Sequence, residues 1–312
     1  MYIGLDIGGT KCAVVLGDEQ GNILRKTRFA TTTKDETLAR LLQSAAEWED
    51  VLPRVKSIGV SCGGPLDART GHILSPPNLP GWDDVPITEL LTARFGIPAY
   101  LCNDANACAL AEWKFGAGKG TQNMIFLTFG TGLGAGLILN GKLYDGTNGM
   151  AGEVGHIRLS SMGPVGYGKA GSFEGFCSGG GLAQLGKTLA MEQWQMGGTV
   201  GYCDGPAHAE EITAKSIAEA ANAGDPTAKE VYRLCGEMLG RGLSVLIDIL
   251  NPERIVIGSV FQRSEGLLRD AMENVIQKET LALSRSVCRV VPAALEESLG
   301  DHAALAVAMT GI

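Results

Sequence analysis

The sequence predicts an α/β protein built from two related domains, and three observations support this. Segments with the apolar pattern of buried strands alternate with helical segments along most of the 312 residues. A glycine-rich strand–turn–strand pattern at the N-terminus returns about 120 residues later, a distance too long for a solenoid and typical of a duplicated domain. The length corresponds to about two domains of ordinary size.

The two copies of the repeat occupy residues 2–24 and 125–145. Each has an apolar strand, a glycine turn and a second apolar strand, and when they are aligned without gaps Leu5 falls on Leu127 and Gly8 on Gly130. The second copy contains an uncharged apolar stretch from Met124 to Leu139. Because glycines interrupt this stretch and it is short for a membrane span, it is expected to form two strands and a turn.

Alternating elements follow each copy. Strands are expected at 55–61, 99–102, 254–257 and 287–291, and helices at 36–51, 86–95, 104–115, 179–190, 213–223, 226–250 and 301–310. The last helix is expected to pack back on the first domain. The predicted domains are residues 1–114 with about 298–312, and residues 115–297, with the ligand in a cleft between them.

Composition limits the possible partners and the compartment. The net charge of −8 argues against nucleic acid, because binding phosphates needs a basic surface. None of the eight cysteines forms a C-x-x-C pair, so free thiols in a reducing cytosol are expected. The N-terminus lacks the pattern of a signal peptide. We therefore expect a cytoplasmic protein that binds neither nucleic acid nor membrane.

Both glycine turns could bind phosphate. Asp6 ends a strand before the Gly8-Gly9-Thr10-Lys11 turn, and Gly130-Thr131-Gly132 occupies the matching place in the second copy. Amides in such turns bind phosphate oxygens, Asp6 could hold Mg²⁺ directly or through water, and Lys11 could neutralise the transferring phosphoryl group. Each turn alone could be an ordinary hairpin, and neither is a Walker A motif, but two in matching positions favour a nucleotide site.

Asp104 is the candidate general base. It follows Asn103 where an apolar strand ends and a helix begins. One interpretation makes Asp104 only the N-cap of that helix. The other makes it the acceptor of a proton from a substrate hydroxyl that attacks the γ-phosphate of ATP.

Further polar residues suit a polyol substrate. Gly64 and Asn78 lie in two loops rich in small and polar residues, and Glu153 and His156 lie three residues apart beside glycines. Carboxylate, amide and imidazole groups bind sugar hydroxyls with directional hydrogen bonds. A single histidine such as His156 is more often structural than ligand-binding.

Together these motifs resemble the ROK family of repressors and sugar kinases over nearly the whole chain. Asp6–Lys11 and Gly130–Gly136 look like its two phosphate loops, and Gly152–His156 matches its signature. The resemblance implies a duplicated actin-like ATPase fold of the ribonuclease-H type, a homodimer or a tetramer of dimers, and phosphoryl transfer from MgATP to the 6-hydroxyl of a hexose. It also implies that Asn103, Glu153, His156 and Glu174 contact the sugar, and that the strand before Gly258 leads to the adenosine-side loop.

The sequence departs from the family pattern in two places. The family has C-x-C-G-x-x-G-C-x-E after its signature histidine and binds a structural zinc there, whereas this chain has Val165, Tyr167 and Ser172 in place of the cysteines. We therefore expect no structural zinc, with the loop held by packing of Tyr167 and Phe173. The adenosine-side loop keeps only Gly258 of the usual glycine pair.

The sequence thus predicts an ATP- and Mg²⁺-dependent hexose kinase, with glucose as the first candidate. Another hexose or an N-acetylhexosamine (N-acetylglucosamine, N-acetylmannosamine, allose, fructose or mannose) is the main alternative. A repressor is disfavoured by the acidic charge and by a phosphate loop that starts at residue 6, ahead of which such regulators carry a DNA-binding segment. A non-catalytic sugar sensor is disfavoured because such a protein needs neither Asp104 nor Asp6.

Overall fold

The computed structural model describes residues 1–311 and falls into two compact units. The first unit comprises residues 1–122, 136–151 and 294 onward, and the second comprises residues 123–135 and 152–293. The sequence assigned residues 136–151 to the C-terminal domain, whereas here they group with the N-terminal residues. The predicted domain boundaries stay a prediction.

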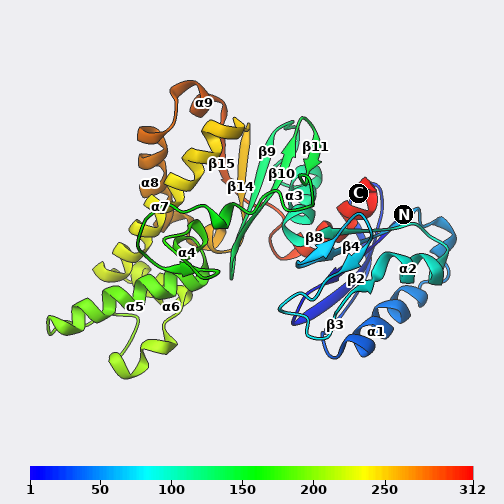
Figure 1. The fold of residues 1–312 in the computed structure, drawn as a ribbon, viewed down its shortest axis with the longest axis horizontal. Helices are drawn as coiled ribbons and strands as arrows, with labels where there is room; N and C mark the ends of the chain where they lie inside the picture. The colour runs from blue at the N-terminus through cyan, green and yellow to red at the C-terminus, as the bar shows by residue number, and fades with distance from the viewer. Residues whose placement is uncertain (312) are drawn as a thin grey trace. The chain divides into compact units, whose positions relative to one another are not determined.

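A five-stranded sheet forms the centre of the first unit (Figure 1). Its order is β3 (Ile23–Ala30), β2 (Lys11–Gly17), β1 (Tyr2–Ile7), β4 (Ser57–Cys62) and β8 (Ala99–Asn103). The first three strands are antiparallel neighbours, and β4 and β8 run parallel to β1. Four of the six β1 residues and all six of β4 are buried, as expected for strands covered on both faces.

Different residues of β1 and β4 face the two sides of this sheet. Ile3, Leu5, Ile58 and Val60 belong to a core that also contains Leu41 of α1 (Lys34–Ala46) and Leu91 of α2 (Ile87–Phe95). The alternate residues Gly4 and Gly59 face the last helix instead. Two-residue periodicity along the strands therefore assigns large apolar side chains to one face and glycines to the other.

The last helix, α10 (Leu299–Thr310), lies directly on the glycine face. A Cβ atom on Gly59 would come within 2.2 Å of the Ala308 nitrogen and 2.3 Å of the Ala304 oxygen, so only glycine allows this approach. α10 packs on β1, on β4 and on α3 (Asp104–Phe115). The prediction that the C-terminal helix returns to the first domain is confirmed.

The second five-stranded sheet has the order β11 (Lys142–Tyr144), β10 (Leu133–Leu139), β9 (Met124–Phe129), β14 (Arg254–Ile257) and β15 (Arg289–Pro292). When β9, β10 and β11 are matched to β1, β2 and β3, and β14 and β15 to β4 and β8, both sheets have the same strand order. The apolar stretch from Met124 to Leu139 is thus two strands and a turn, as predicted. The protein is an α/β protein with the duplicated actin-like ATPase fold.

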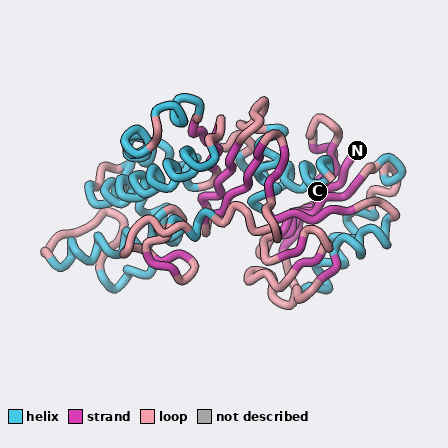
Figure 2. Tube along the Cα trace, turned by 45° about the horizontal axis from the view of Figure 1, so that its top comes forward, coloured by secondary structure: helices cyan, strands magenta, loops and turns pink. Residues whose placement is uncertain are grey.

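The helices of the second unit are α4 (Phe173–Phe176), α5 (Gly179–Gln195), α6 (Ala214–Asn222), α7 (Pro226–Leu250), α8 (Val260–Glu279) and α9 (Ala282–Val287). α7 and α8 pack closely (Figure 2), with a Cβ on Gly240 reaching to within 2.6 Å of the Met272 oxygen. Asp225 caps the N-terminus of α7, and Pro226 occupies its first turn, where no N–H is needed. The sequence did not predict α8.

Short elements complete the fold. The 3-10 turns are Leu52–Arg54, Val154–His156, Pro206–Glu211 and Glu296–Ser298, and the small strands are β5 (Leu66–Asp67), β6 (His72–Ile73), β7 (Val85–Pro86), β12 (Val165–Gly166) and β13 (Lys169–Ala170). All eight cysteines are free, as predicted. Within residues 1–311, the helices are too short or too polar for any of them to span a bilayer.

Candidate active site

In the first unit, candidate residues lie at the carboxyl ends of the parallel strands β1, β4 and β8. The register pairs Asp6 of β1 with Ser61 of β4, and Ser61 with Cys102 of β8. β8 then ends at Asn103, and Asp104 opens α3. Because parallel strands end at one edge of a sheet, the fold brings Asp6 and Asp104 to the same edge although they are far apart in sequence.

Asn103, not Asp104, caps α3. The Asn103 Oδ1 accepts the N–H of Ala105 at 3.0 Å and the residue has extended backbone angles, which define the N-cap. Asp104 is the first helical residue, is exposed, and accepts the same N–H through its Oδ1 at 2.8 Å. The interpretation of Asp104 as the helix cap is therefore wrong.

Two glycines keep the space around Asp104 free of side chains. A Cβ on Gly63 would lie 3.7 Å from the side-chain amide of Asn78 and 3.9 Å from the Asp104 Oδ2. A Cβ on Gly64 would lie 3.4 Å from the Asn103 Nδ2. The structure therefore brings together one carboxylate, two amide side chains and bare backbone, which suits a polyhydroxylated ligand.

The first glycine turn lies against the same loops. Gly9 packs so closely on Asn78 that a Cβ on Gly9 would come within 2.4 Å of the backbone oxygen of Asn78. The Gly8 N–H closes the turn on the Lys11 oxygen at 3.2 Å, so it is used within the turn. Thr10 and Lys11 are exposed, with Lys11 at the start of β2. Of the predicted phosphate-binding amides, that of Gly8 is thus engaged by the protein itself.

Asp6 lies in an unfavourable electrostatic environment. Burial, followed by the charges of Asp301 and Asp104, raises the pKa of its carboxyl from the ordinary 3.8 to about 6, against smaller opposing effects of Lys11 and Lys26. Asp301 is buried and forms an ion pair with Lys26. A carboxylate held this way gains most from a cation, so Asp6 fits the role of a Mg²⁺ ligand.

We expect Asp6→Asn to stabilise the ligand-free protein above about pH 6. The carboxyl of Asp6 has a higher pKa in the folded protein than in the unfolded chain. Its contribution to the free energy of unfolding is therefore fully present below about pH 3.8 and is lost as pH rises through about 6, where the folded protein must hold a charged Asp6. A shift of about two pKa units corresponds to about 1–3 kcal/mol after allowance for relaxation. Urea denaturation of both proteins between about pH 5 and 8, without Mg²⁺ or nucleotide, measures this.

Asp18→Asn is the matched control for this prediction. Hydrogen bonds from the Asn22 side chain and from backbone N–H groups lower the pKa of exposed Asp18, so its removal should destabilise the protein at neutral pH. Equal unfolding midpoints of wild type and Asp6→Asn at every pH would contradict the assignment of a raised pKa to Asp6.

In the second unit, the N-termini of two helices lie beside the second glycine turn. The Gly130 oxygen accepts the N–H of Gly179 at 2.8 Å, which places the N-terminus of α5 there. A Cβ on Gly130 would lie 3.6 Å from the Ser259 Oγ, which places the start of α8 there as well. Two helix N-termini beside Gly130-Thr131-Gly132 form an arrangement that favours anions.

The sequence interpretation missed Gly179, and it left the contacts around Gly258 and Ser259 open. The run Ser178–Gly181 opening a helix was the available signal for the first. Ser259 has φ 59°, a rare left-handed conformation for a residue other than glycine, and no sequence pattern announces it. Gly258 is buried beside Phe126 and donates its N–H to the Leu127 oxygen at 3.0 Å. Its predicted contact with ATP could therefore not use this amide.

The predicted sugar contacts of the second unit gather around β10. Glu153 and His156 are exposed at either end of the short 3-10 turn Val154–His156. Glu174 is half-buried on α4, and its Oε2 accepts the N–H of Leu133 at 3.0 Å. Gly155 lies between Leu133 and Glu174, since a Cβ on Gly155 would be 2.2 Å from the backbone oxygen of Leu133 and 3.2 Å from the Glu174 Cβ. Glu153, His156 and Glu174 therefore belong to one loop cluster.

The family model described as "ROK family" matches residues 2–310, essentially the whole chain. The chain belongs to the ROK family. A glucokinase of Streptomyces coelicolor is 34% identical over 302 residues, which cover 96% of this chain and 95% of that protein. The DNA-binding transcriptional dual regulator NagC of Escherichia coli is 28% identical over 303 residues, covering 94% of this chain and 72% of that protein.

Solved ROK structures support the same fold. A ROK family glucokinase from Streptomyces griseus, in complex with glucose and AMPPNP, is 31% identical with a TM-score of 0.75, and 99% of each chain is covered. A ROK hexokinase from Thermus thermophilus is 28% identical with a TM-score of 0.80, covering 99% of this chain and 98% of that one. Sugar kinases and regulators of the ROK family are thus both similar to this chain.

The zinc-binding pattern of ROK kinases does not fit this chain. Val165 has no ligand atom, Tyr167 is 80% exposed, and the Ser172 Oγ caps α4 by accepting the Gly175 N–H at 3.0 Å. Phe173 is fully buried, and its ring lies against Gly242 of α7, where a Cβ would come within 2.3 Å of it; that it braces the loop stays a prediction. The expectation that Tyr167 packs under the loop is wrong, because the ring is exposed and makes a T-shaped contact with His156, with 5.1 Å between the ring centroids. Across residues 1–311, no cluster of three His, Cys, Asp or Glu side chains could hold a metal.

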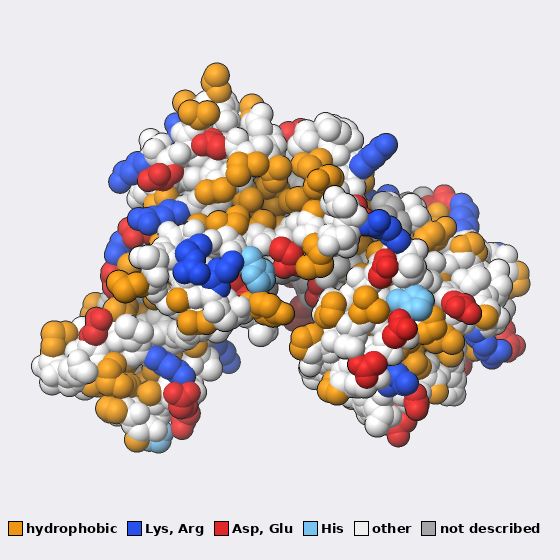
Figure 3. Space-filling model, viewed as in Figure 1, with side chains coloured by type: hydrophobic (Ala, Val, Ile, Leu, Met, Phe, Trp, Pro, Cys, Tyr) orange, Lys and Arg blue, Asp and Glu red, His pale blue; other side chains and the backbone are white. Residues whose placement is uncertain are grey.

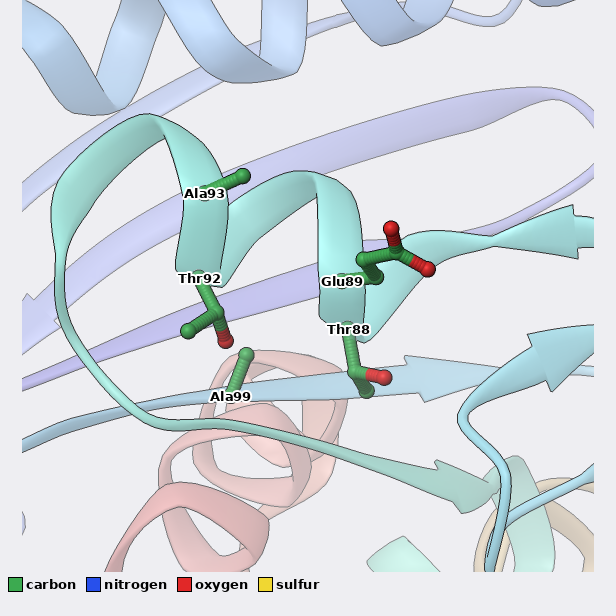
Figure 4. Close-up of a pocket in the computed structure, with 5 residues that line it drawn as sticks. All are labelled: Thr88, Glu89, Thr92, Ala93 and Ala99. Carbon is green, nitrogen blue, oxygen red and sulfur yellow. The ribbon is translucent and has the colours of Figure 1, made fainter.

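A surface hollow in the first unit lies apart from the candidate residues. This cavity, about 410 Å³ in volume, lies between α2 and the start of β8 and is lined by Thr88, Glu89, Thr92, Ala93 and Ala99 (Figure 4). The side chains of Thr88 and Thr92 point from α2 toward Ala99, whereas that of Glu89 points in another direction. The cavity contains none of the predicted site residues and has no part in the proposed chemistry.

Proposed function

We propose that this ROK protein is a sugar kinase that transfers the γ-phosphoryl group of ATP to the 6-hydroxyl of a hexose, with glucose as the first candidate. One observation carries the proposal. The exposed carboxylate of Asp104 begins a helix beside Asn78, Asn103 and two glycines, on the same sheet edge as Asp6. A ligand-binding regulator needs the amides but has no use for a carboxylate placed as a base.

In the proposed reaction, Asp104 accepts the proton of the 6-hydroxyl while that oxygen attacks the γ-phosphorus. The bond between the γ-phosphorus and the bridging oxygen breaks, ADP leaves, and Asp104 later releases the proton to water. Gly9 and Thr10 offer backbone amides to phosphate oxygens, and Lys11 balances their charge. Mg²⁺, when bound by Asp6 directly or through water, would neutralise charge on the phosphates.

We assign nucleotide and sugar contacts to the second unit as well. The Gly130-Thr131-Gly132 turn, with the N-termini of α5 and α8, suits the phosphates of ATP. Glu153, His156 and Glu174 suit sugar hydroxyls because they supply carboxylate and imidazole groups from one loop cluster. The structure of the Streptomyces griseus glucokinase with glucose and AMPPNP supports this assignment by similarity.

Two alternatives have support. Another hexose or an N-acetylhexosamine would need only one or two different hydrogen bonds. A non-catalytic sugar-binding regulator is supported by the similarity to NagC. The kinase and the regulator differ in whether bound sugar and ATP give ADP.

A coupled ADP-release assay over a panel of hexoses and N-acetylhexosamines tests the proposal. We expect sugar-dependent ADP release with the highest kcat/KM for glucose. A higher value for another sugar would replace glucose as substrate. Sugar binding by calorimetry without ADP release for any sugar would support the regulator instead.

We further propose that the partner is a second copy of the chain, through the surface around α9. Ile249, Leu281, Leu283 and Val287 are all at least half exposed, and Leu281 is tied to the end of α7 by a hydrogen bond from its N–H to Asp248. Figure 3 shows a few hydrophobic side chains projecting at the tip of the second unit, where Figure 1 places α9. Exposed apolar patches commonly mark interfaces. Light scattering after size exclusion should give twice the chain mass of 32.7 kDa.

A further inference from the structure

The loop between His156 and Glu174 is held by a specific contact at the first position where the ROK pattern has a zinc-binding cysteine. The side chain of Gln184, on α5, accepts the N–H of Val165 through Oε1 at 2.9 Å. Its Nε2 also donates to the oxygen of Val165 at 2.9 Å. One side-chain amide therefore pairs both polar backbone groups of one residue, as a neighbouring strand would.

We propose that Gln184 is a positioning residue that holds the sugar-contacting loop without a metal. The inference rests on the proposed sugar contacts of Glu174 and His156. Zinc would fix such a loop through cysteine ligands, and this chain supplies none of the three. Gln184 instead fixes the backbone of the residue that replaces the first cysteine, so the loop needs no ligand atom there.

The contact reaches Glu174 through close packing. A Cβ on Gly166 would lie 2.5 Å from the Gly175 nitrogen and 2.9 Å from the Glu174 Cβ, so the hairpin strand β12 lies directly on α4. The Gly171 N–H also donates to the Pro164 oxygen at 3.0 Å. A displacement of Val165 must therefore move the backbone that carries Glu174, whose carboxylate is bound to Leu133.

The same loop is tied back to His156. Phe173 donates its N–H to the Ile157 oxygen at 2.8 Å, and the Lys169 Nζ donates to the His156 oxygen at 2.7 Å. α5, which carries Gln184, begins at Gly179 beside the second glycine turn. One rigid helix thus connects the sugar-contacting loop to the proposed phosphate turn.

Replacing Gln184 tests the inference in a way that does not depend on kinase activity. Gln184→Met keeps the length of the side chain but removes both hydrogen bonds, and Gln184→Glu keeps only the acceptor for the Val165 N–H. Hydrogen exchange of residues 164–175 in the sugar-free protein should be about tenfold faster in Gln184→Met and less accelerated in Gln184→Glu. Gln195→Met, at the exposed end of the same helix, should exchange like wild type in this segment.

Kinetics and metal analysis complete the test. With an active kinase, Gln184→Met should raise KM for the sugar about tenfold while KM for ATP stays within about twofold. Exchange in 164–175 that is unchanged in Gln184→Met, or stoichiometric zinc in the purified wild type, would overturn the inference. If the wild type releases no ADP but Gln184→Met still exchanges faster than wild type in residues 164–175, the role of Gln184 in holding the loop stands and the proposed kinase activity is refuted.

Discussion

Asp104→Asn is expected to lower kcat by at least about 100-fold, the lower end of the range for loss of a general base. Asparagine keeps the size of the side chain and an oxygen for the Ala105 N–H, but it cannot accept a proton from the 6-hydroxyl. Sugar binding should weaken much less than kcat, because the amide still fits beside Asn78 and Asn103. Steady-state kinetics and calorimetric sugar titration of the same preparation measure both quantities.

Two comparisons keep this result from being read as a folding effect. Asn103 is the N-cap of α3, so Asp104→Asn removes only a modest interaction with the helix terminus. Asp35→Asn makes the same change in the first turn of α1, where Asp35 is 88% exposed, and should leave kcat unaltered. Near-wild-type kcat in Asp104→Asn would rule out the residue as the base.

The arrangement of Asp6 and Asp104 could be inferred from the sequence because local signals suffice for it. Apolar runs identify the strands, and parallel strands end on one edge of the sheet, so polar residues just after them must come close together. The repeat of the glycine turns likewise predicted two sheets of one design. These features depend on pattern and chain order and hardly at all on particular long-range contacts.

Other parts of the site depend on contacts that no local pattern reveals. Gln184 looks like any polar residue of an amphipathic helix, and its role follows only from the distant hairpin that it meets. The left-handed backbone of Ser259 reflects how α8 begins beside the second glycine turn. Tyr167 was expected to pack inward because it is aromatic, but the backbone of its turn directs it to solvent.

Glu112 is the clearest such case, because a glutamate in an alanine-rich helix is normally a surface residue. Here it is fully buried near the C-terminal end of α3, the helix that begins with Asp104. Its Oε1 accepts the N–H groups of Ala294 at 3.0 Å and Leu295 at 2.9 Å, and its Oε2 accepts that of Ala117 at 2.7 Å. The chain passes from the second unit to the first at Ala294, so Glu112 anchors that crossing.

Glu112→Ala should therefore lower the free energy of unfolding by about 3 kcal/mol or more, because three backbone N–H groups lose their acceptor and each costs about 1–3 kcal/mol when buried without one. The free energy of unfolding of Glu112→Gln should fall between those of wild type and Glu112→Ala, because the amide retains one accepting oxygen but points its NH₂ group at backbone N–H donors. Glu89→Ala, on the exposed side of α2, is the matched control and should change stability by less than about 0.5 kcal/mol. Urea denaturation measures all three. A Glu112→Ala protein as stable as Glu89→Ala would show that water replaces the carboxylate and that the crossing at Ala294 is held by other contacts.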